Sequence, residues 1–170
     1  DQGMPVHAIG KIPEFFNGRG ITTSDHTTNN HDHATALLNE VESGSSPFVF
    51  ANFEDFDMLY GHRNDCLGFA NCLSEFDSVL GKILLSLRPG DLLILTNDHG
   101  NDPTTASTDH SREYAMMLAA GKSICPGINL GDRKSFSDLA ATIREVFGLK
   151  PGDNGLSFLP AILRTSAISN

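Results

Sequence analysis

The sequence has little positive charge. Its 170 residues include 12 lysines and arginines against 21 aspartates and glutamates, which gives a formal net charge of −9. An acidic surface repels phosphate backbones and anionic headgroups, so we expect neither nucleic acid nor a membrane as a partner. The chain also has no apolar run near the ~18–20 residues that a membrane span needs, and no signal peptide is visible.

Cysteine is scarce as well. Cys66, Cys72 and Cys125 make an odd count without the spacing of a zinc knuckle. We interpret them as free thiols, which indicates a reducing, cytoplasmic location. The length and a hydrophobic fraction of 39% are typical of one domain with a sizeable core, over residues 1–170. The first residue is Asp1 rather than Met, so we expect a mature or trimmed piece of a gene product.

Apolar runs and turn residues predict an alternation of strands and helices. The run LLIL is apolar on both faces, which is typical of a central strand in a parallel sheet. The pattern favours an α/β fold with a mainly parallel sheet flanked by helices. Strands are expected at 4–9, 48–53, 92–95 and 114–119, helices at 28–42, 67–87, 136–147 and 156–163, one helical turn at 13–16, and loops at 19–25 and after residue 53.

A histidine-rich stretch, HTTNNHDH, lies at residues 26–33, where the first long helix is expected to start. Thr28 or Asn29 is a candidate N-cap, because both side chains can accept a hydrogen bond from the first turn. We interpret the histidines here as solvated or capping residues rather than as a metal site.

Aspartate and histidine gather where two of the expected strands end. The strand at 48–53 is followed by Asp57 and His62, and LLIL is followed by Asp98 and His99. In open α/β sheets, ligands bind beyond the carboxyl ends of the strands. Both pairs therefore lie where a functional site is expected.

A third pair, Asp109 and His110, follows a proline-containing loop and precedes the last expected strand. Carboxylates that converge in an acidic protein repel one another unless a cation neutralises them. Oxygen and nitrogen ligands together suit Mn²⁺ or Zn²⁺, and two ions ~3.5–4 Å apart can clamp a phosphoryl group. A single Asp–His pair in a loop is typically a solvated turn, so the metal hypothesis depends on the three pairs occurring together.

Several stretches closely resemble one enzyme family. DFDMLYGHRND, TNDHGNDPTTASTDHSREY, NLGDRKSFSDLAATIREVFG and the leading IGKIPEFFNGRGIT are similar to the phosphopentomutases, which belong to the alkaline phosphatase superfamily of metalloenzymes. The resemblance covers nearly all 170 residues. It implies an alkaline-phosphatase-like core, two Mn²⁺ ions, and the interconversion of ribose 1-phosphate and ribose 5-phosphate or their deoxy forms.

The resemblance also implies a ligand set. Asp57, His62 and His110 match the ligands of one metal, and Asp98 and His99 match two ligands of the other. The family's threonine nucleophile, its remaining aspartate ligand and its cap domain precede everything that matches here. The chain therefore resembles the C-terminal half of the catalytic core, and we expect it to hold one ion weakly or none and to be inactive alone.

Basic residues near these motifs are candidates for holding the substrate phosphate. Lys11 follows a strand end and Arg112 follows His110, and arginine suits bidentate contact with phosphate. A surface charge or a structural ion pair is the alternative for each. The sequence departs from the family at Asn97, where a small residue is usual, and at Ala115, where a Val-Pro pair usually follows Tyr114.

Two functional hypotheses stay open at this point. The first is a phosphopentomutase-like isomerase, present as a fragment that needs the missing N-terminal half as a partner and a sugar phosphate as substrate. The second is a stand-alone, degenerate metal-binding or interaction protein without catalysis. A third, residual phosphatase activity with one metal, would disappear when His62 is replaced by alanine.

Overall fold

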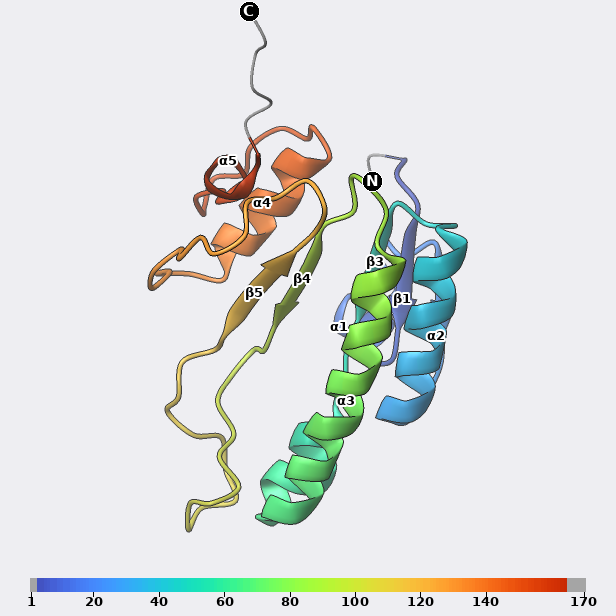
Figure 1. The fold of residues 1–170 in the computed structure, drawn as a ribbon. Helices are drawn as coiled ribbons and strands as arrows, with labels where there is room; N and C mark the ends of the chain where they lie inside the picture. Colours follow the sequence, from blue (N-terminus) through green and yellow to red (C-terminus); the bar gives the residue numbers. More distant parts are fainter. Residues whose placement is uncertain (1–2, 165–170) are drawn as a thin grey trace, which may run out of the picture. The chain divides into compact units, whose positions relative to one another are not determined.

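The computed structural model describes residues 3–164, in which strands and helices alternate (Figure 1). The chain forms two compact units. The first lies within Asp1–Leu87 and Ile94–Leu118, and the second lies within Arg88–Leu93 and Ala119–Asn170. All of the aspartates and histidines singled out as metal ligands belong to the first unit.

The sheet of the first unit forms around β1 (Val6–Ile9), whose Ala8 and Ile9 are completely buried. β2 (Thr23–Asp25) and β3 (Phe48–Ala51) pair with β1 on its two sides, both parallel to it. This confirms the predicted α/β class. The prediction of a loop over 19–25 is wrong for β2, because a short polar strand paired by main-chain hydrogen bonds leaves no apolar pattern in the sequence.

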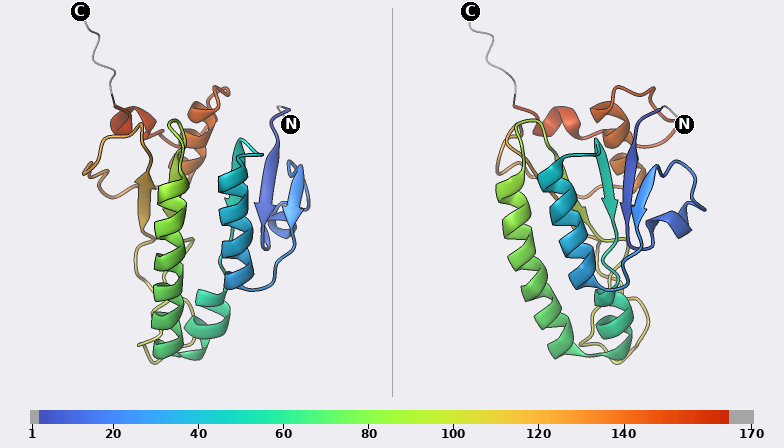
Figure 2. Two further views of the ribbon diagram at one scale, coloured as in Figure 1. Left: turned by 45° about the vertical axis from the view of Figure 1, so that its right-hand side comes forward. Right: turned by 90° about the vertical axis from the view of Figure 1, so that its right-hand side faces the viewer.

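Two helices of the first unit lie side by side, as the two further views also show (Figure 2). α2 (Asn30–Ser43) begins at Asn29, whose side chain accepts a hydrogen bond from the Asp32 amide, and ends at Gly44, which is left-handed with φ 62°. α3 (Cys66–Ser86) begins at Asp65, whose carboxylate caps Gly68 N. Both helices confirm the predicted ones to within about two residues.

The segment after β3 is helical, although the sequence predicts a polar loop there. It starts with a π-helix, η1 (Phe56–Tyr60), and continues as a 3₁₀ turn, η2 (Gly61–Arg63). Phe56 anchors η1 against Phe76 of α3, with ring centroids 5.9 Å apart. π-Turns are rare and often occur at functional sites; this one carries Asp57.

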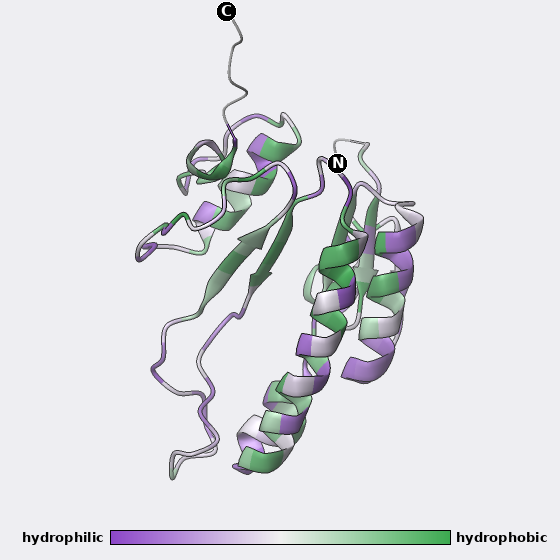
Figure 3. Cartoon of the chain, viewed as in Figure 1, coloured by the Kyte–Doolittle hydropathy of each residue, from purple (hydrophilic) through white to green (hydrophobic). Residues whose placement is uncertain are grey.

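β4 (Leu93–Thr96) and β5 (Met117–Ala120) form a two-stranded sheet. Both strands are hydrophobic along their length (Figure 3). The sequence predicts a central strand at LLIL, buried on both faces. Within residues 3–164, β4 instead pairs with β5 alone and is half-buried. The apolar side chains of a strand indicate that it can be buried, but they do not indicate how many strands pair with it.

The second unit contains α4 (Ser137–Val146) and the single turn α5 (Leu159–Ile162). Asp138 ties the unit together, because its carboxylate accepts hydrogen bonds from Arg133 Nε and from the Leu156 amide, each at 2.7 Å. These bonds hold the pKa of Asp138 below its ordinary value, with the Leu156 amide as the larger cause. Of the helices in the described part of the chain, none has the length and apolar character needed to span a membrane.

A short helix, α1 (Ile12–Phe15), follows β1 directly and confirms the predicted helical turn. It starts after Gly10, whose φ of +76° and close approach to Asn52 O leave no room for a side chain. Lys11 is thereby placed at the carboxyl end of β1, next to the segment that follows β3.

Candidate metal centre

η1 and η2 place Asp57 and His62 beside each other. His62 Nε2 lies 3.2 Å from Asp57 Oδ2. On the other side of the ring, His62 Nδ1 donates to the Thr108 carbonyl oxygen at 2.5 Å. The five-residue spacing of the two residues, through a π-turn followed by a 3₁₀ turn, therefore turns both side chains to the same side of the segment.

The segment between β4 and β5, residues 97–116, is named the site loop; it has no helix and no strand (Figure 1). Its two arms are joined by an antiparallel bridge between Gly100 and Ser111, in which Ser111 N donates to Gly100 O at 2.9 Å. A Cβ at Gly100 would lie 2.9 Å from the Ser111 carbonyl oxygen, so glycine is needed for this approach. The bridge stacks His99 on His110, with ring centroids 3.6 Å apart.

The site loop and η1–η2 meet at the Asp57 carboxylate. His110 Nε2 lies 3.4 Å from Asp57 Oδ1, and the rings of His62 and His110 are 4.9 Å apart. One donor atom from each of Asp57, His99 and His110 can be chosen so that all lie within 4.8 Å of one another. Asp57, His62, His99 and His110 are named the ligand cluster.

The donor chemistry of the ligand cluster fits a metal ion. Because His62 Nδ1 donates to a carbonyl, Nε2 is the lone-pair nitrogen of the neutral ring, and it faces a carboxylate oxygen. The lone pairs of His62 Nε2 and of the Asp57 oxygen repel each other at this distance unless a proton or a cation lies between them. Atoms about 2.0–2.2 Å from one ion lie roughly 3.0–3.5 Å from each other, and both contacts of Asp57 with histidine nitrogens have such lengths.

Asp98 lies at the margin of the ligand cluster. Its side chain is 85% exposed, and its Oδ1 is 3.5 Å from His99 Nε2. The resemblance pairs Asp98 and His99 at one metal and places His110 at another. The stacking of His99 on His110 brings the two predicted ligand sets into contact, so the sets are neighbours rather than separate sites.

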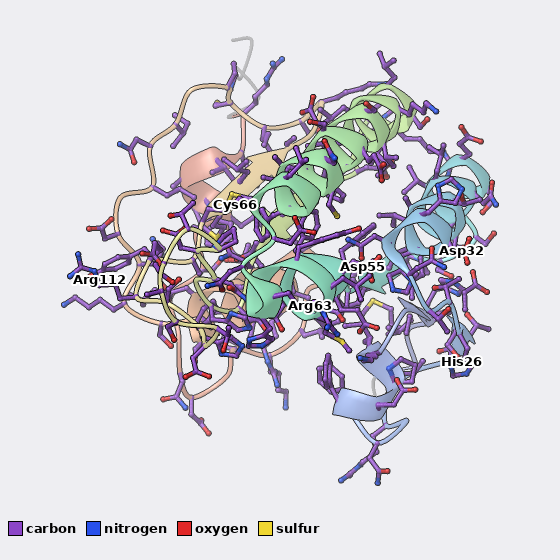
Figure 4. The ribbon with its side chains drawn as sticks, turned by 90° about the horizontal axis from the view of Figure 1, so that it is seen from below. His26, Asp32, Asp55, Arg63, Cys66 and Arg112 are labelled. Carbon is purple, nitrogen blue, oxygen red and sulfur yellow. The ribbon has the colours of Figure 1, made fainter. Side chains whose placement is uncertain are left out.

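Of the two candidate phosphate-binding residues, Lys11 lies beside η1. Its Nζ is 3.2 Å from Glu54 Oε2 and 2.9 Å from the sulfur of Met58, the residue after Asp57. Arg112 is exposed, and its side chain points away from the ribbon (Figure 4). Within residues 3–164 the Arg112 side chain makes no ion pair.

Two asparagines of the site loop contact the cluster, and sequence reasoning assigned neither a role there. Asn97 Nδ2 donates to His99 O at 2.6 Å, and its Oδ1 accepts from Met116 N at 2.8 Å, so Asn97 ties the two arms of the loop together. Asn101 Nδ2 donates to Asp57 Oδ1 at 2.5 Å. The position of both asparagines next to the Asp98–His99 pair could have indicated such a role, because asparagine side chains readily form hydrogen bonds with nearby main chain.

The threonines of the site loop have structural roles. Thr104 donates its hydroxyl to Asp102 Oδ1 at 2.7 Å, and Thr105 donates to Asp102 O at 3.0 Å. The bonds from the Thr104 hydroxyl and amide hold the pKa of Asp102 below its ordinary value. Asp102 and these two threonines therefore hold the turn of the site loop.

The histidines before and within the first turn of α2 differ among themselves. His26 and His31 are exposed, as the interpretation of solvated residues expects. For His33 that interpretation is wrong, because His33 is completely buried, with Nδ1 2.5 Å from the Thr27 hydroxyl and the ring edge-on to Phe53. Burial lowers its pKa. Position 33 is the fourth residue of α2 and faces the sheet, which helical periodicity could have indicated.

The family model of the metalloenzyme superfamily matches residues 6–151 of the chain. Curated relatives include phosphopentomutases from Carboxydothermus hydrogenoformans, 50% identical over 152 residues, and from an Anaeromyxobacter species, 51% identical over 169 residues. The matches cover 89% and 96% of this chain but 39% and 42% of the relatives. The chain thus spans about two fifths of the length of these relatives.

Solved structures share the fold at low sequence identity. A phosphoglycerate mutase from Leishmania mexicana, solved at low cobalt concentration, matches 91% of this chain and 37% of its own, with a TM-score of 0.67 and 18% identity. The PH0037 protein from Pyrococcus horikoshii matches 89% of this chain and 51% of its own, with a TM-score of 0.63 and 18% identity. Both support the α/β arrangement described above.

Proposed function

The chain belongs to the metalloenzyme superfamily, and we propose that it forms part of an enzyme that moves phosphate between C1 and C5 of ribose or deoxyribose. The observation that carries this proposal is the convergence of Asp57, His99 and His110, which come from segments more than 40 residues apart. Relatives that are about half identical over most of the chain, and that are named phosphopentomutases, supply the reaction.

We assign the ligands as the resemblance implies. Asp57, His62 and His110 would hold one ion, and Asp98 and His99 would contribute to the second, with Mn²⁺ as the proposed metal. Two such ions, when bound, neutralise the charge of a transferring phosphoryl group and align its attacking and departing oxygens. The remaining ligands and the hydroxyl that accepts the phosphoryl group come, in this proposal, from the rest of the enzyme. The free thiols of this chain support a cytoplasmic enzyme.

The residues of this chain prepare the site. Main-chain carbonyls at Nδ1 of His62 and of His99 fix the tautomer that presents Nε2 as a ligand. Lys11, beside Met58, would exchange its ion pair with Glu54 for the substrate phosphate. Arg112, exposed two residues after His110, would make bidentate contact with the same group once substrate is bound.

A chimera tests the proposed reaction. Residues 1–170 replace the matching segment of the Carboxydothermus phosphopentomutase, and conversion of ribose 1-phosphate to ribose 5-phosphate is measured with Mn²⁺. We expect conversion, and we expect His110→Ala to lower the rate by more than ~100-fold, because loss of an outer-shell partner of a metal ligand alone costs ~10–100-fold.

His26→Ala is the matched control in the chimera, since His26 is exposed and bonds to Ser24 outside the ligand cluster. It should leave the rate unchanged. A folded chimera that binds Mn²⁺ but does not isomerise the sugar phosphate would contradict the proposal. That result would favour the second hypothesis, a metal-binding protein without this catalysis.

A further inference from the structure

Asp57 has a partner in the site loop that is not itself a candidate ligand. Asn101 donates its Nδ2–H to Asp57 Oδ1, the same oxygen that lies 3.4 Å from His110 Nε2. The Asp57 side chain is 28% exposed, so part of its hydration is replaced by this contact. A carboxylate that accepts a fixed hydrogen bond has fewer rotamers available to it, and its second oxygen points in a defined direction.

Gly61 leaves the space that the Asn101 amide occupies. A Cβ at Gly61 would overlap Nδ2, Cγ and Oδ1 of Asn101. Gly61 has φ −61°, a conformation that any residue adopts, so the backbone does not require glycine here. A side chain at this position, one residue before His62, would therefore displace the Asn101 amide.

The main chain on both sides of Asn101 is held as well. Gly100 O accepts from Ser111 N at 2.9 Å, and Asp102 N donates to the Ser111 hydroxyl at 2.8 Å. Ser111 thus fixes the residues before and after Asn101. The amide is presented to Asp57 by an ordered backbone and needs little further ordering to bond the carboxylate.

We propose that Asn101 is a positioning residue for Asp57, and that the absence of a side chain at Gly61 leaves room for the Asn101 amide. The Asn101 amide orients the Asp57 carboxylate so that its oxygens face the histidine nitrogens of the ligand cluster. This inference rests on the proposed metal centre and deepens it. Outer-shell partners of this kind typically change metal affinity by ~10–100-fold when they are removed.

The affinity of the full chain for Mn²⁺ tests the inference, with free Mn²⁺ followed by electron paramagnetic resonance. Asn101→Ala should weaken binding by ~10–100-fold. Asn101→Leu, which keeps bulk against Gly61 but has no donor, should weaken it similarly and decides the matter if the alanine variant does not fold. Asn71→Ala is the control, because Asn71 is exposed on α3, and it should bind as the wild type does.

The Gly61→Ala substitution provides a second, independent test. Alone, it should weaken Mn²⁺ binding by displacing the Asn101 amide. In the Asn101→Ala background it should have no further effect, because there is no amide left to displace. A purely structural role predicts additive effects together with a lowered unfolding temperature of the metal-free chain.

Three outcomes separate the possibilities. Wild-type affinity in both Asn101 variants overturns this inference and leaves the proposed function in place. Additive effects of the Gly61 and Asn101 substitutions also overturn it. A wild-type chain that leaves Mn²⁺ unbound at millimolar concentration overturns it too, since there is then no ion to position, whereas the chimera assay judges the proposed function separately.

Discussion

His62 and His99 each direct Nδ1 at a main-chain carbonyl oxygen, Thr108 O and Gly100 O, respectively. In both rings this leaves Nε2 for a carboxylate or a metal ion. The histidines of the ligand cluster thus differ from His33, whose ring is also hydrogen-bonded at Nδ1 but is completely buried and lies edge-on to Phe53. The surroundings of each imidazole, rather than its presence in the sequence, decide its role.

His33 makes the stability of the chain depend on pH. Its ring is buried with Nε2 unpartnered, and burial lowers its pKa below the ordinary 6.5. Above pH 6.5 the ring is neutral in both the folded and the unfolded chain. As pH falls below 6.5 the unfolded chain takes up a proton first, so stability is lost, by at most about 1.4 kcal/mol per pH unit for one proton.

Chemical unfolding at pH 8 and pH 5.5 measures this loss. His33→Gln should reduce the difference in unfolding free energy between the two pH values, although it lowers stability at both. His31→Gln, on the exposed face of the same helix, should leave the difference as in the wild type. If His33→Gln and the wild type lose stability in parallel, His33 is not the group responsible.

For the helices and strands, the sequence predicts the elements that depend on local chemistry and misses those that depend on contacts with distant segments. The bounds of α2 and α3 follow from caps and apolar spacing, at Asn29, Gly44 and Asp65. β2 and η1 have no such signal, because TSD pairs through its main chain and the π-helix packs through Phe56. The apolar spacing likewise predicts too great a length for the last helix, which was expected at 156–163 and is a single turn.

The same division holds for the site. Asp57, His62 and His99 were expected because they follow strand ends, and His110 because it matches the same family motifs, and the structure brings the four together. The contact of Asn101 with Asp57 was not expected, because it depends on the empty space at Gly61 and on the bridge from Gly100 to Ser111. Such contacts arise from the path of the site loop and leave no periodic pattern.

The N-cap of α2 gives a prediction for one element. Sequence reasoning left Thr28 and Asn29 open, and the structure shows that Asn29 Oδ1 accepts from Asp32 N at 2.9 Å. Asn29→Ala should therefore lower the free energy of unfolding by about 1 kcal/mol. Thr28→Ala, one residue earlier and exposed, should change it by less than ~0.5 kcal/mol. Equal losses in denaturant unfolding would contradict the assigned cap.

At the scale of the whole molecule, the ligand cluster lies within one of the two compact units and draws on two of its segments. The unit needs the site loop to close on η1–η2 before a metal site exists. Contacts from Thr108 to His62, from Thr105 O to Asn64 and from Pro103 O to Cys66 hold the loop there. A metal ion bound by both segments would stabilise this closure further by mass action.

We propose that the segment carrying Asp57 and the segment carrying His99 and His110 share one metal ion. Calorimetric titration of the full chain with Mn²⁺ tests it most directly, with Asp57→Ala as the variant and Asp77→Ala, exposed on α3, as the control. We expect one weakly bound ion per chain in the wild type and the control, and at least ~10-fold weaker binding in Asp57→Ala. Binding in Asp57→Ala equal to that of the wild type would contradict it.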